Sequence, residues 1–191
     1  MRKYLPPTMK QIPVEAKCKF RGEIFDVYQW PQKMFDGTTK TFEMLKRDDT
    51  VTTVAVKNDK VVITYQTQPG QDWFYDLPGG RHDNPQEDEL MAAQRELKEE
   101  TGMVFKNWKL VEAKQLFLKI DWAVYTFVAM DFVEEGEQEL DAGEKIEVLE
   151  LTLDELREYA KKPNAKHILP DFLKKVRCLE ELRELPALYK Y

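Results

Sequence analysis

The stretch from Leu77 to Met103 reads LPGGRHDNPQEDELMAAQRELKEETGM, and it determines how the rest of the chain is interpreted. Its pattern predicts a strand end, a Gly-Gly turn, an amphipathic helix and a glycine stop. Leu90, Ala93 and Leu97 recur at helical spacing and give the helix a buried stripe. Gly102 suits the left-handed residue that follows the last turn.

We expect this helix to begin at Pro85. Asp83 or Asn84 can cap it, because a short polar side chain accepts a hydrogen bond from the first turn. Pro85 suits the first helical position, where no amide proton is needed.

Three carboxylates crowd one side of the predicted helix. At about 100° per residue, Glu96 and Glu100 project within about 40° of each other, and Glu99 lies about 60° to the other side of Glu96. Such like charges repel, and Arg95 and Lys98 relieve only part of the repulsion. A divalent cation such as magnesium would relieve it better, because it takes carboxylate oxygens as ligands. The alternative is a solvated, charged helix face with no ligand.

The segment resembles the signature of the Nudix hydrolases. That signature is a glycine, five residues, Glu, seven residues, Arg-Glu, an apolar residue, any residue, Glu-Glu, any residue, Gly and an apolar residue. Here Glu87 stands seven residues before the run Arg95–Met103, as the pattern requires. Six residues instead of five separate Gly80 from Glu87, which indicates a one-residue insertion in the loop.

Composition agrees with one enzyme domain and a small appendage. The chain has 191 residues, 34% of them charged, and a net charge of −6, so we expect no nucleic-acid partner. No apolar run reaches transmembrane length, and no signal-peptide core is present, so we expect no membrane partner. Cys18 and Cys178 are predicted to be free thiols of a cytoplasmic protein.

The remaining pattern predicts an α+β fold. Residues 1–12 are expected to form a loosely held arm, and residues 13–47 a small antiparallel sheet with a turn at Asp36-Gly37. Further strands are expected on both sides of the helix, followed by a helix capped by Thr152 and a last helix over 170–185. This order is similar to the Nudix fold, a mixed sheet sandwiched between helices, so we divide the chain into 1–47 and a Nudix domain at 48–191.

The small N-terminal sheet makes the chain resemble the ADP-ribose pyrophosphatase branch of the family. That resemblance implies metal ligands at the glycine pair and on the helix, here Gly79, Glu96, Glu99 and Glu100. It also implies Mg²⁺ as cofactor, with Mn²⁺ as an alternative, and a homodimer formed through the N-terminal sheet.

The resemblance further implies a loop glutamate that binds metal or activates water. Glu144 in the run EKIEV fits that position, with Glu139 and Glu147 as rivals. Glu99 is the second catalytic candidate, and Arg95 is assigned to orienting the glutamates by charge-assisted hydrogen bonds.

Substrate-binding candidates are of two kinds, charged or polar residues for a phosphate and aromatic residues for a base. Gln68 stands where relatives carry an arginine on a phosphate, so Arg47, Lys119 and Arg81 are the candidates that would replace its charge. The alternative for each of them is a solvated surface residue. Tyr28 and Trp30 could stack on a base, although packing within the small sheet is the alternative.

The sequence therefore predicts magnesium-dependent hydrolysis of the diphosphate bond of ADP-ribose or a related nucleoside diphosphate sugar. The products would be a nucleoside monophosphate and a sugar phosphate. Two alternatives stay open: a Nudix hydrolase of nucleoside triphosphates, and a non-catalytic nucleotide sensor on the same fold.

Overall fold

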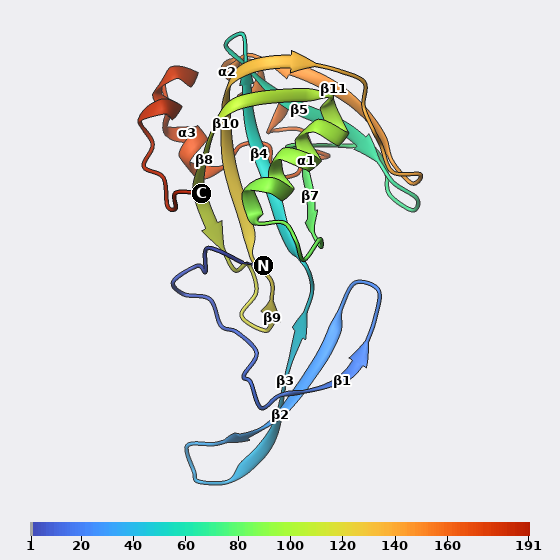
Figure 1. Cartoon of the computed structure of the whole chain (residues 1–191), viewed down its shortest axis with the longest axis vertical. Coiled ribbons are helices and arrows are strands. Elements are labelled where there is room, and N and C mark those ends of the chain that lie inside the picture. The colour runs from blue at the N-terminus through green and yellow to red at the C-terminus, as the bar shows by residue number, and fades with distance from the viewer. Residues whose placement is uncertain (1) are drawn as a thin grey trace.

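Two β-sheets and a few short helices make up the protein in a computed structural model that describes residues 2–191 (Figure 1). The smaller sheet projects from the main body, and its strands lie in the order β1-β2-β3-β9. These strands are β1 Lys17–Arg21, β2 Asp26–Lys33, β3 Thr39–Lys46 and β9 Ile120–Asp121. The first three are antiparallel neighbours, as predicted, and β9 joins β3 in parallel.

The larger sheet is mixed and has the order β11-β5-β4-β10-β8, with β6 added on β5 and β7 added on β4. Its two central strands, β4 and β10, run parallel, and the other pairs are antiparallel. The strands are β4 Asp49–Lys57, β5 Lys60–Thr67, β6 Phe74–Asp76, β7 Gly79–His82, β8 Met103–Lys114, β10 Val124–Glu135 and β11 Lys145–Leu151.

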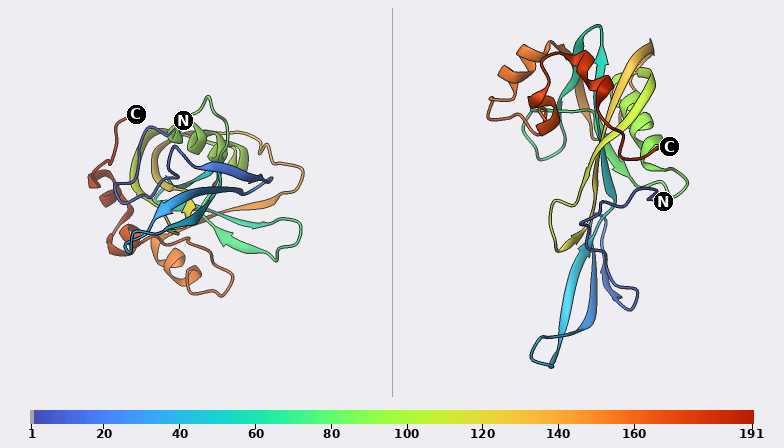
Figure 2. Two further views of the ribbon diagram at one scale, coloured as in Figure 1. Left: turned by 90° about the horizontal axis from the view of Figure 1, so that it is seen from below. Right: turned by 90° about the vertical axis from the view of Figure 1, so that its left-hand side faces the viewer.

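Helices cover both faces of this sheet, and Figure 2 shows them on opposite sides. Helix α1, Glu89–Thr101, lies on one face. The other face carries α2 Leu153–Tyr159, α3 Asp171–Lys175 and a 3₁₀ helix, η1, Leu179–Glu184. The predicted α+β sandwich is therefore confirmed.

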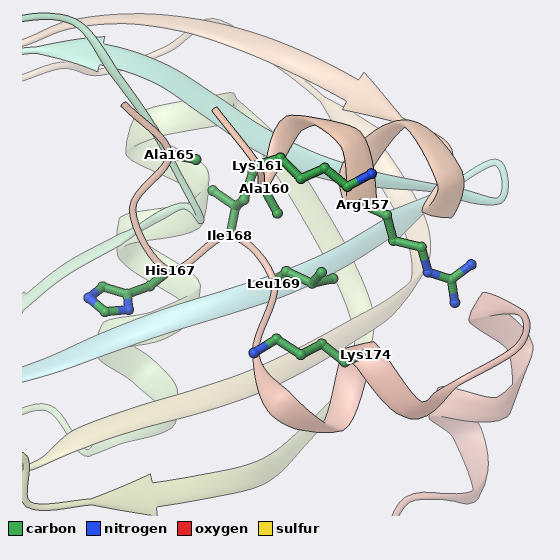
Figure 3. A pocket seen from close by; sticks show the side chains of 8 residues that line it. All are labelled: Arg157, Ala160, Lys161, Ala165, His167, Ile168, Leu169 and Lys174. Atoms are coloured by element: carbon green, nitrogen blue, oxygen red, sulfur yellow. The ribbon is translucent and has the colours of Figure 1, made fainter. Parts of the chain in front are cut away.

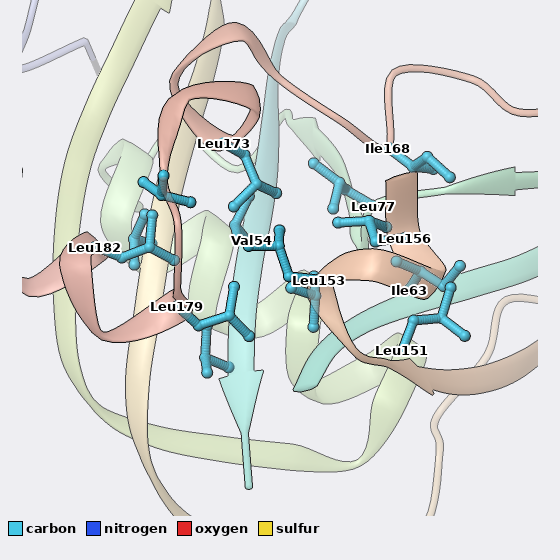
Figure 4. Packing of buried hydrophobic residues seen from close by; sticks show 14 of the residues in the cluster. Val54, Ile63, Leu77, Leu151, Leu153, Leu156, Ile168, Leu173, Leu179 and Leu182 are labelled. Atoms are coloured by element: carbon cyan, nitrogen blue, oxygen red, sulfur yellow. The ribbon is translucent and has the colours of Figure 1, made fainter. Parts of the chain in front are cut away.

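Alternation along the strands explains the two layers. Val54 and Ile63 point to the α2–α3 face, where they pack with Leu156, Leu173 and their neighbours (Figure 4). The chain neighbours of these two residues, Ala55 and Val62, point to the other face. There they pack, with Ala129 of β10, against Leu97 of α1. Because successive strand side chains face opposite ways, each central strand supplies both cores. The mainly apolar runs of β4, β5 and β10 are what a sheet covered on both faces requires.

Helix α1 starts four residues later than Pro85, so that prediction is wrong. Asp88 is the cap, and its Oδ1 accepts a hydrogen bond of 2.8 Å from the amide of Met91. Asn84 instead closes a turn before the helix, because its Oδ1 accepts from Gln86 N at 3.0 Å. At the other end Gly102 is left-handed, with φ of 71°, as predicted.

The predicted helix over 170–185 is broken. Helix α3 ends at Lys175, Val176 is extended, and the chain resumes as the 3₁₀ helix η1. Arg157 of α2 donates to the carbonyl of Val176 at 2.8 Å, a contact that a continuous helix would deny it. Both pieces still bury their apolar residues against the same core.

The N-terminal arm is not loosely held, contrary to expectation. Arg2 forms a two-pronged ion pair with Asp49, at 2.5 and 2.6 Å, and reaches Asp121 at 2.7 Å. Met9 is buried in the core beneath α1. Proline content suggested looseness, but buried carboxylates elsewhere in the chain provide the partners that fix the arm.

The Thr152 cap and the two free cysteines are as predicted. Thr152 caps α2 in a capping box with Glu155. Cys18 and Cys178 are both free and exposed. Over residues 2–191, none of the helices has the length and apolar character needed to cross a membrane. The division at residue 47 stays a prediction.

We predict that Gly102→Ala destabilises the fold by at least about 2 kcal/mol. A left-handed non-glycine residue costs about 1–2 kcal/mol, and the added Cβ would overlap the carbonyl oxygen of Gly136. Gly37→Ala is the matched control, since Gly37 is also left-handed but faces open space. Urea unfolding of both variants measures the difference, and equal losses would contradict the clash with Gly136.

Candidate active site

The catalytic candidates meet where β7 passes beneath α1. A Cβ at Gly80 would meet the carboxylate of Glu96, so glycine leaves room for this side chain against the strand. The amide of Gly79 donates to Glu100 Oε2 at 2.8 Å. The predicted Gly-Gly turn is wrong, because Gly79 and Gly80 begin strand β7 and pair with Thr52 and Val51 of β4. This strand and the carboxylates of α1 are in direct contact.

Arg95 holds the carboxylates together from one side. Its Nη1 donates to Glu96 Oε1 at 2.8 Å and to Glu99 Oε2 at 2.9 Å. Its Nε lies 3.2 Å from both oxygens of Glu87, and Nη2 donates to the carbonyl of Arg81 at 3.1 Å. One guanidinium thus ties α1 to the end of β7 and to the loop between them, which supports its assigned orienting role.

The acidic loop after β10 brings a fourth carboxylate to the site. Its backbone is pinned to the end of α1, because Glu139 N donates to the carbonyl of Glu99 at 2.8 Å. Glu144 follows and is half-buried, whereas Glu139 and Glu147 are exposed. The amide of Gln68 reaches Glu144 Oε1 at 3.3 Å, so these two predicted residues are neighbours.

Burial and mutual repulsion change the acidity of these groups. Burial raises the pKa of Glu96 to about 7; Arg95 opposes the shift, while Glu99 and Glu144 add to it. Burial also raises the pKa of Glu100 well above its usual value, and raises that of Glu144. Each carboxylate makes it harder to ionise the next, as expected when like charges share a desolvated site.

Asp76 belongs to this group although the sequence interpretation missed it. It lies at the end of β6, its Oδ1 accepts from Leu77 N at 2.8 Å, and burial raises its pKa to about 7. Its charge also adds to the raised pKa of Glu100. The signal was available: one acid in an otherwise aromatic and apolar strand, two residues before Pro78.

A divalent cation fits the chemistry of these donors. All of them are oxygens, and Glu96, Glu99 and Glu100 place three carboxyl groups against the single guanidinium of Arg95, an imbalance that a hard cation would relieve. Within residues 2–191, no three acidic, histidine or cysteine side chains are already arranged as a metal cage. Arg95 and the Gly79 amide occupy several of the oxygens instead.

Arg47 and Arg81 lie close enough for the charge of Arg81 to act on Arg47. Burial, and then the charge of Arg81, lower the pKa of Arg47. The guanidinium of Arg47 stacks 4.6 Å from the ring centre of Trp122, and its Nε is buried without a hydrogen-bond partner in the described chain. The charge of Arg81 is felt at Glu144 as well. Trp122 was not among the predicted residues.

The predicted base-stacking residues lie elsewhere, on β2 of the small sheet. Trp30 is buried against Phe42, with ring centres 5.6 Å apart, and Nε1 donates to Gln32. Tyr28 lies on the same strand. Over the described chain, neither has a hydrogen bond or ion pair to the carboxylates of α1.

The largest apolar hollow on the opposite face is separate from this site. It is a cavity of about 550 Å³ between α2 and α3, and Figure 3 shows the residues that line it. They include His167, Ile168, Leu169 and Lys174 but no carboxylate. In Figure 3 the side chains of His167, Lys174 and Arg157 point in different directions, so they form no common binding point.

Comparison with known proteins agrees with this geometry. The sequence pattern of the NUDIX domain matches residues 46–172. The chain belongs to the Nudix hydrolase family. The matched span includes α1, the Gly79-Gly80 pair, Glu144, Arg47 and Arg81. The family signature and the observed carboxylate cluster therefore coincide.

Two curated relatives cover most of the chain. The "ADP-ribose pyrophosphatase" of Bacillus subtilis is 30% identical over 142 residues, covering 71% of this Nudix chain and 75% of the relative. The "Methanol dehydrogenase activator" of Bacillus methanolicus is 27% identical over 160 residues, covering 78% and 82%.

Solved structures share the fold. An "ADP compounds hydrolase" superposes with a TM-score of 0.65 at 17% identity, covering 94% of this chain and 96% of the other. A "NUDIX hydrolase" from Nitrosomonas europaea gives a TM-score of 0.57 at 22% identity, covering 75% and 96%. At these identities the likeness concerns the fold.

We predict that the metal-free protein loses stability as pH rises through about 7. Asp76 and Glu96 both have raised pKa values in the folded state, so their protonated forms stabilise it at low pH and that contribution is lost on ionisation. A shift of this size corresponds to about 2–4 kcal/mol between pH 5 and pH 8. Thermal melting in EDTA over that range measures it.

Asp76→Asn provides the control, because an amide cannot ionise. Its melting temperature should vary less with pH than that of the wild type. A wild type whose stability is flat, or rises, between pH 6 and pH 8 would contradict the raised pKa values.

Proposed function

We propose that this Nudix hydrolase cleaves the diphosphate bond of ADP-ribose or a related nucleoside diphosphate sugar, with Mg²⁺ as cofactor and Mn²⁺ as a substitute. The observation that carries the proposal is the pairing of a carboxylate cluster on α1 with two arginines that have no acidic partner within hydrogen-bonding distance among residues 2–191. The similarity to a protein named ADP-ribose pyrophosphatase supports the same substrate class.

A diphosphate fits both halves of this arrangement. One phosphate would lie at the carboxylates, where a cation bridges the like charges, and the next would lie at Arg81 and Arg47. Burial, and then the charge of Arg81, lower the pKa of Arg47, and its buried Nε has no partner among residues 2–191, so an anion would best satisfy this guanidinium. A neutral or singly charged ligand would leave one half of the site uncompensated.

Each residue then has a defined task. A divalent cation held by Glu96, Glu99, Glu100 and the carbonyl of Gly79 would supply Lewis-acid activation of the phosphate and of a bound water. Glu144, with its raised pKa, takes the proton of the attacking water. Arg95 keeps Glu96 and Glu99 oriented.

Gln68 acts through Glu144 in this proposal. Its amide donates to Glu144, so it orients the base and leaves the phosphate charge to Arg81 and Arg47. Tyr28 and Trp30 would contact the base of a substrate bound at a dimer interface. Two free cysteines and a net charge of −6 fit a cytoplasmic enzyme that acts on small nucleotides and not on nucleic acid.

We predict that Glu96→Gln and Glu100→Gln each lower turnover of ADP-ribose by about 100-fold or more, because one carboxylate less weakens both cation binding and charge stabilisation. Glu144→Gln should lower turnover more than it raises the Michaelis constant. The measurement is monophosphate release from a panel of nucleoside diphosphate sugars and one nucleoside triphosphate, with and without Mg²⁺.

Glu139→Gln is the matched control, since Glu139 is an exposed glutamate of the same loop. Turnover near the wild-type value in both helix variants would remove the carboxylates from catalysis. Cleavage of the triphosphate alone would favour a different Nudix substrate class, and no cleavage of any substrate would favour a sensor.

We predict that Arg81→Gln and Arg47→Gln each raise the Michaelis constant for ADP-ribose by about 10- to 100-fold, with a smaller effect on turnover. A charged hydrogen bond contributes about 1.5–3 kcal/mol, and each 1.4 kcal/mol is about tenfold in binding. Arg177→Gln serves as control, since Arg177 is an exposed arginine paired with Glu181. Unchanged kinetics in both variants would rule out a phosphate site at the arginine pair.

We also propose a homodimer formed largely by residues 13–47. Strand β1 is an edge of the small sheet, and Phe20 and Ile24 beside it are 61% and 58% exposed. Exposed apolar groups on an open strand edge favour association. Light scattering at micromolar concentration should give twice the mass of the 22.6 kDa chain, and Phe20→Glu should shift it toward one chain. A monomeric wild type would refute the dimer.

A further inference from the structure

The first residues of the described chain lie across the start of α1. We call Arg2–Tyr4 the strap. The amides of Lys3 and Tyr4 both donate to Glu89 Oε1, at 2.6 and 3.2 Å, and Lys3 Nζ pairs with the cap residue Asp88 at 2.5 Å. Glu89 is in the first turn of α1 and is completely buried.

The C-terminal tail reaches the same carboxylate. The hydroxyl of Tyr191 donates to Glu89 Oε2 at 3.2 Å, and its ring lies 5.7 Å from that of Phe127 on β10. Tyr189 meets Tyr4 edge-to-face at 6.2 Å. Both ends of the described chain therefore converge on one buried side chain of α1, and Figure 2 shows the two ends close together.

The strap is in turn fixed to the larger sheet. Arg2 binds Asp49 at the start of β4, and Asp49 Oδ1 also accepts from the amide of Ala123 at 2.8 Å. The hydroxyl of Tyr125 on β10 donates to the carbonyl of Tyr4 at 2.8 Å. Glu89 is thus connected through the strap to the two central strands.

A buried carboxylate here is not explained by helix packing alone. An apolar side chain would fill the same space without the cost of desolvating a charge. Within residues 2–191, the three side-chain or backbone groups that donate to the carboxylate of Glu89 belong to Lys3, Tyr4 and Tyr191, outside the span 46–172 that matches the family pattern. Glu89 also occupies none of the fixed positions of the Nudix signature.

Fixing the start of α1 affects its carboxylates because a helix of 13 residues moves as a rod. Glu96 stands seven residues, or about two turns, after Glu89. Its carboxylate lies against Gly80 and leaves no room for a side chain there. A small rotation or slide of α1 at Glu89 therefore changes the distance between Gly79–Gly80 of β7 and the carboxylates.

We propose that Glu89 is a positioning residue that, through the strap and Tyr191, sets the spacing between Gly79–Gly80 and the carboxylates that hold the divalent cation. The proposal rests on the function proposed above. Segments outside the span that matches the family pattern thereby determine how tightly this enzyme binds its cation.

The experiment compares Glu89→Leu, Glu89→Gln and Tyr191→Phe in the full-length protein. Lys57→Met is the matched control, because it breaks a partly buried ion-pair network of Lys57 with Glu135 and Glu150 at the far end of the sheet. Two quantities are measured: the Mg²⁺ concentration for half-maximal turnover, and the rise in melting temperature on adding Mg²⁺ without substrate.

We expect Glu89→Leu to raise the half-saturating Mg²⁺ concentration about fivefold or more and to reduce the Mg²⁺-induced melting shift. Glu89→Gln should restore most of both, since its amide oxygen still accepts from Lys3 and Tyr4, and Tyr191→Phe should fall between them. Lys57→Met should lower the melting temperature without changing either Mg²⁺ response.

Variants that lower the melting temperature yet keep the wild-type Mg²⁺ response would overturn the proposal, because Glu89 would then serve only stability. A wild type whose melting temperature is insensitive to Mg²⁺ would overturn it as well. If the wild type responds to Mg²⁺ but cleaves no diphosphate, the proposed function fails while the melting shift still tests Glu89.

Discussion

Repulsion among the carboxylates of α1 is the constraint on which the rest of the structure depends. Glu96, Glu99 and Glu100 share one side of a short helix and face a strand. Burial, and then the charge of neighbouring carboxylates, raise the pKa of Glu96 and of Glu100. Such an arrangement persists only if the surrounding structure holds it. Arg95 supplies charge from one side, the amide of Gly79 supplies a donor from the other, and the absent side chain of Gly80 supplies the space. A site strained in this way is poised for a cation, because ion binding relieves repulsion that folding has already imposed.

The two ends of α1 are held by different means, and both matter to that constraint. Gly102 ends the helix in a left-handed turn whose carbonyl accepts from Gly136, so the helix end is joined directly to the acidic loop that carries Glu144. Asp88 and Glu89 at the start are held by the strap and by Tyr191. The family pattern covers only the first of these anchors. The second anchor depends on residues that lie outside the span matched by the family pattern.

The sequence predicted the parts of this structure that depend on local chemistry. The glycine stop, the Thr152 cap and the alternation of the central strands are all set by neighbours in the chain. The glycine pair was predicted as a turn, but Gly79 and Gly80 begin strand β7 and pair with β4. The errors arose where distant residues compete with local preference. Asn84 was a plausible cap, but its side chain closes a turn and Asp88 caps instead. The arm looked loose because its partners, Asp49 and Asp121, lie far along the chain. Asp76 escaped notice because only burial beside Glu100 gives a single acid its significance.

Charge also bears on how substrate and cation would meet. The half of the site at α1 is negative and the half at Arg47 and Arg81 is positive, so a diphosphate approaching the metal-free enzyme is attracted at one end and repelled at the other. At an effective dielectric constant near 20, two unit charges about 4 Å apart interact by about 4 kcal/mol, so the two effects are of similar size and largely cancel. Reversing the sign of the carboxylate half with a divalent cation makes both ends attractive. Gln68 fits this balance, because a third positive charge at that position would pair with Glu144, the proposed base. The loss of an arginine at position 68 is therefore consistent with retained hydrolysis, provided that Arg47 and Arg81 carry the phosphate charge.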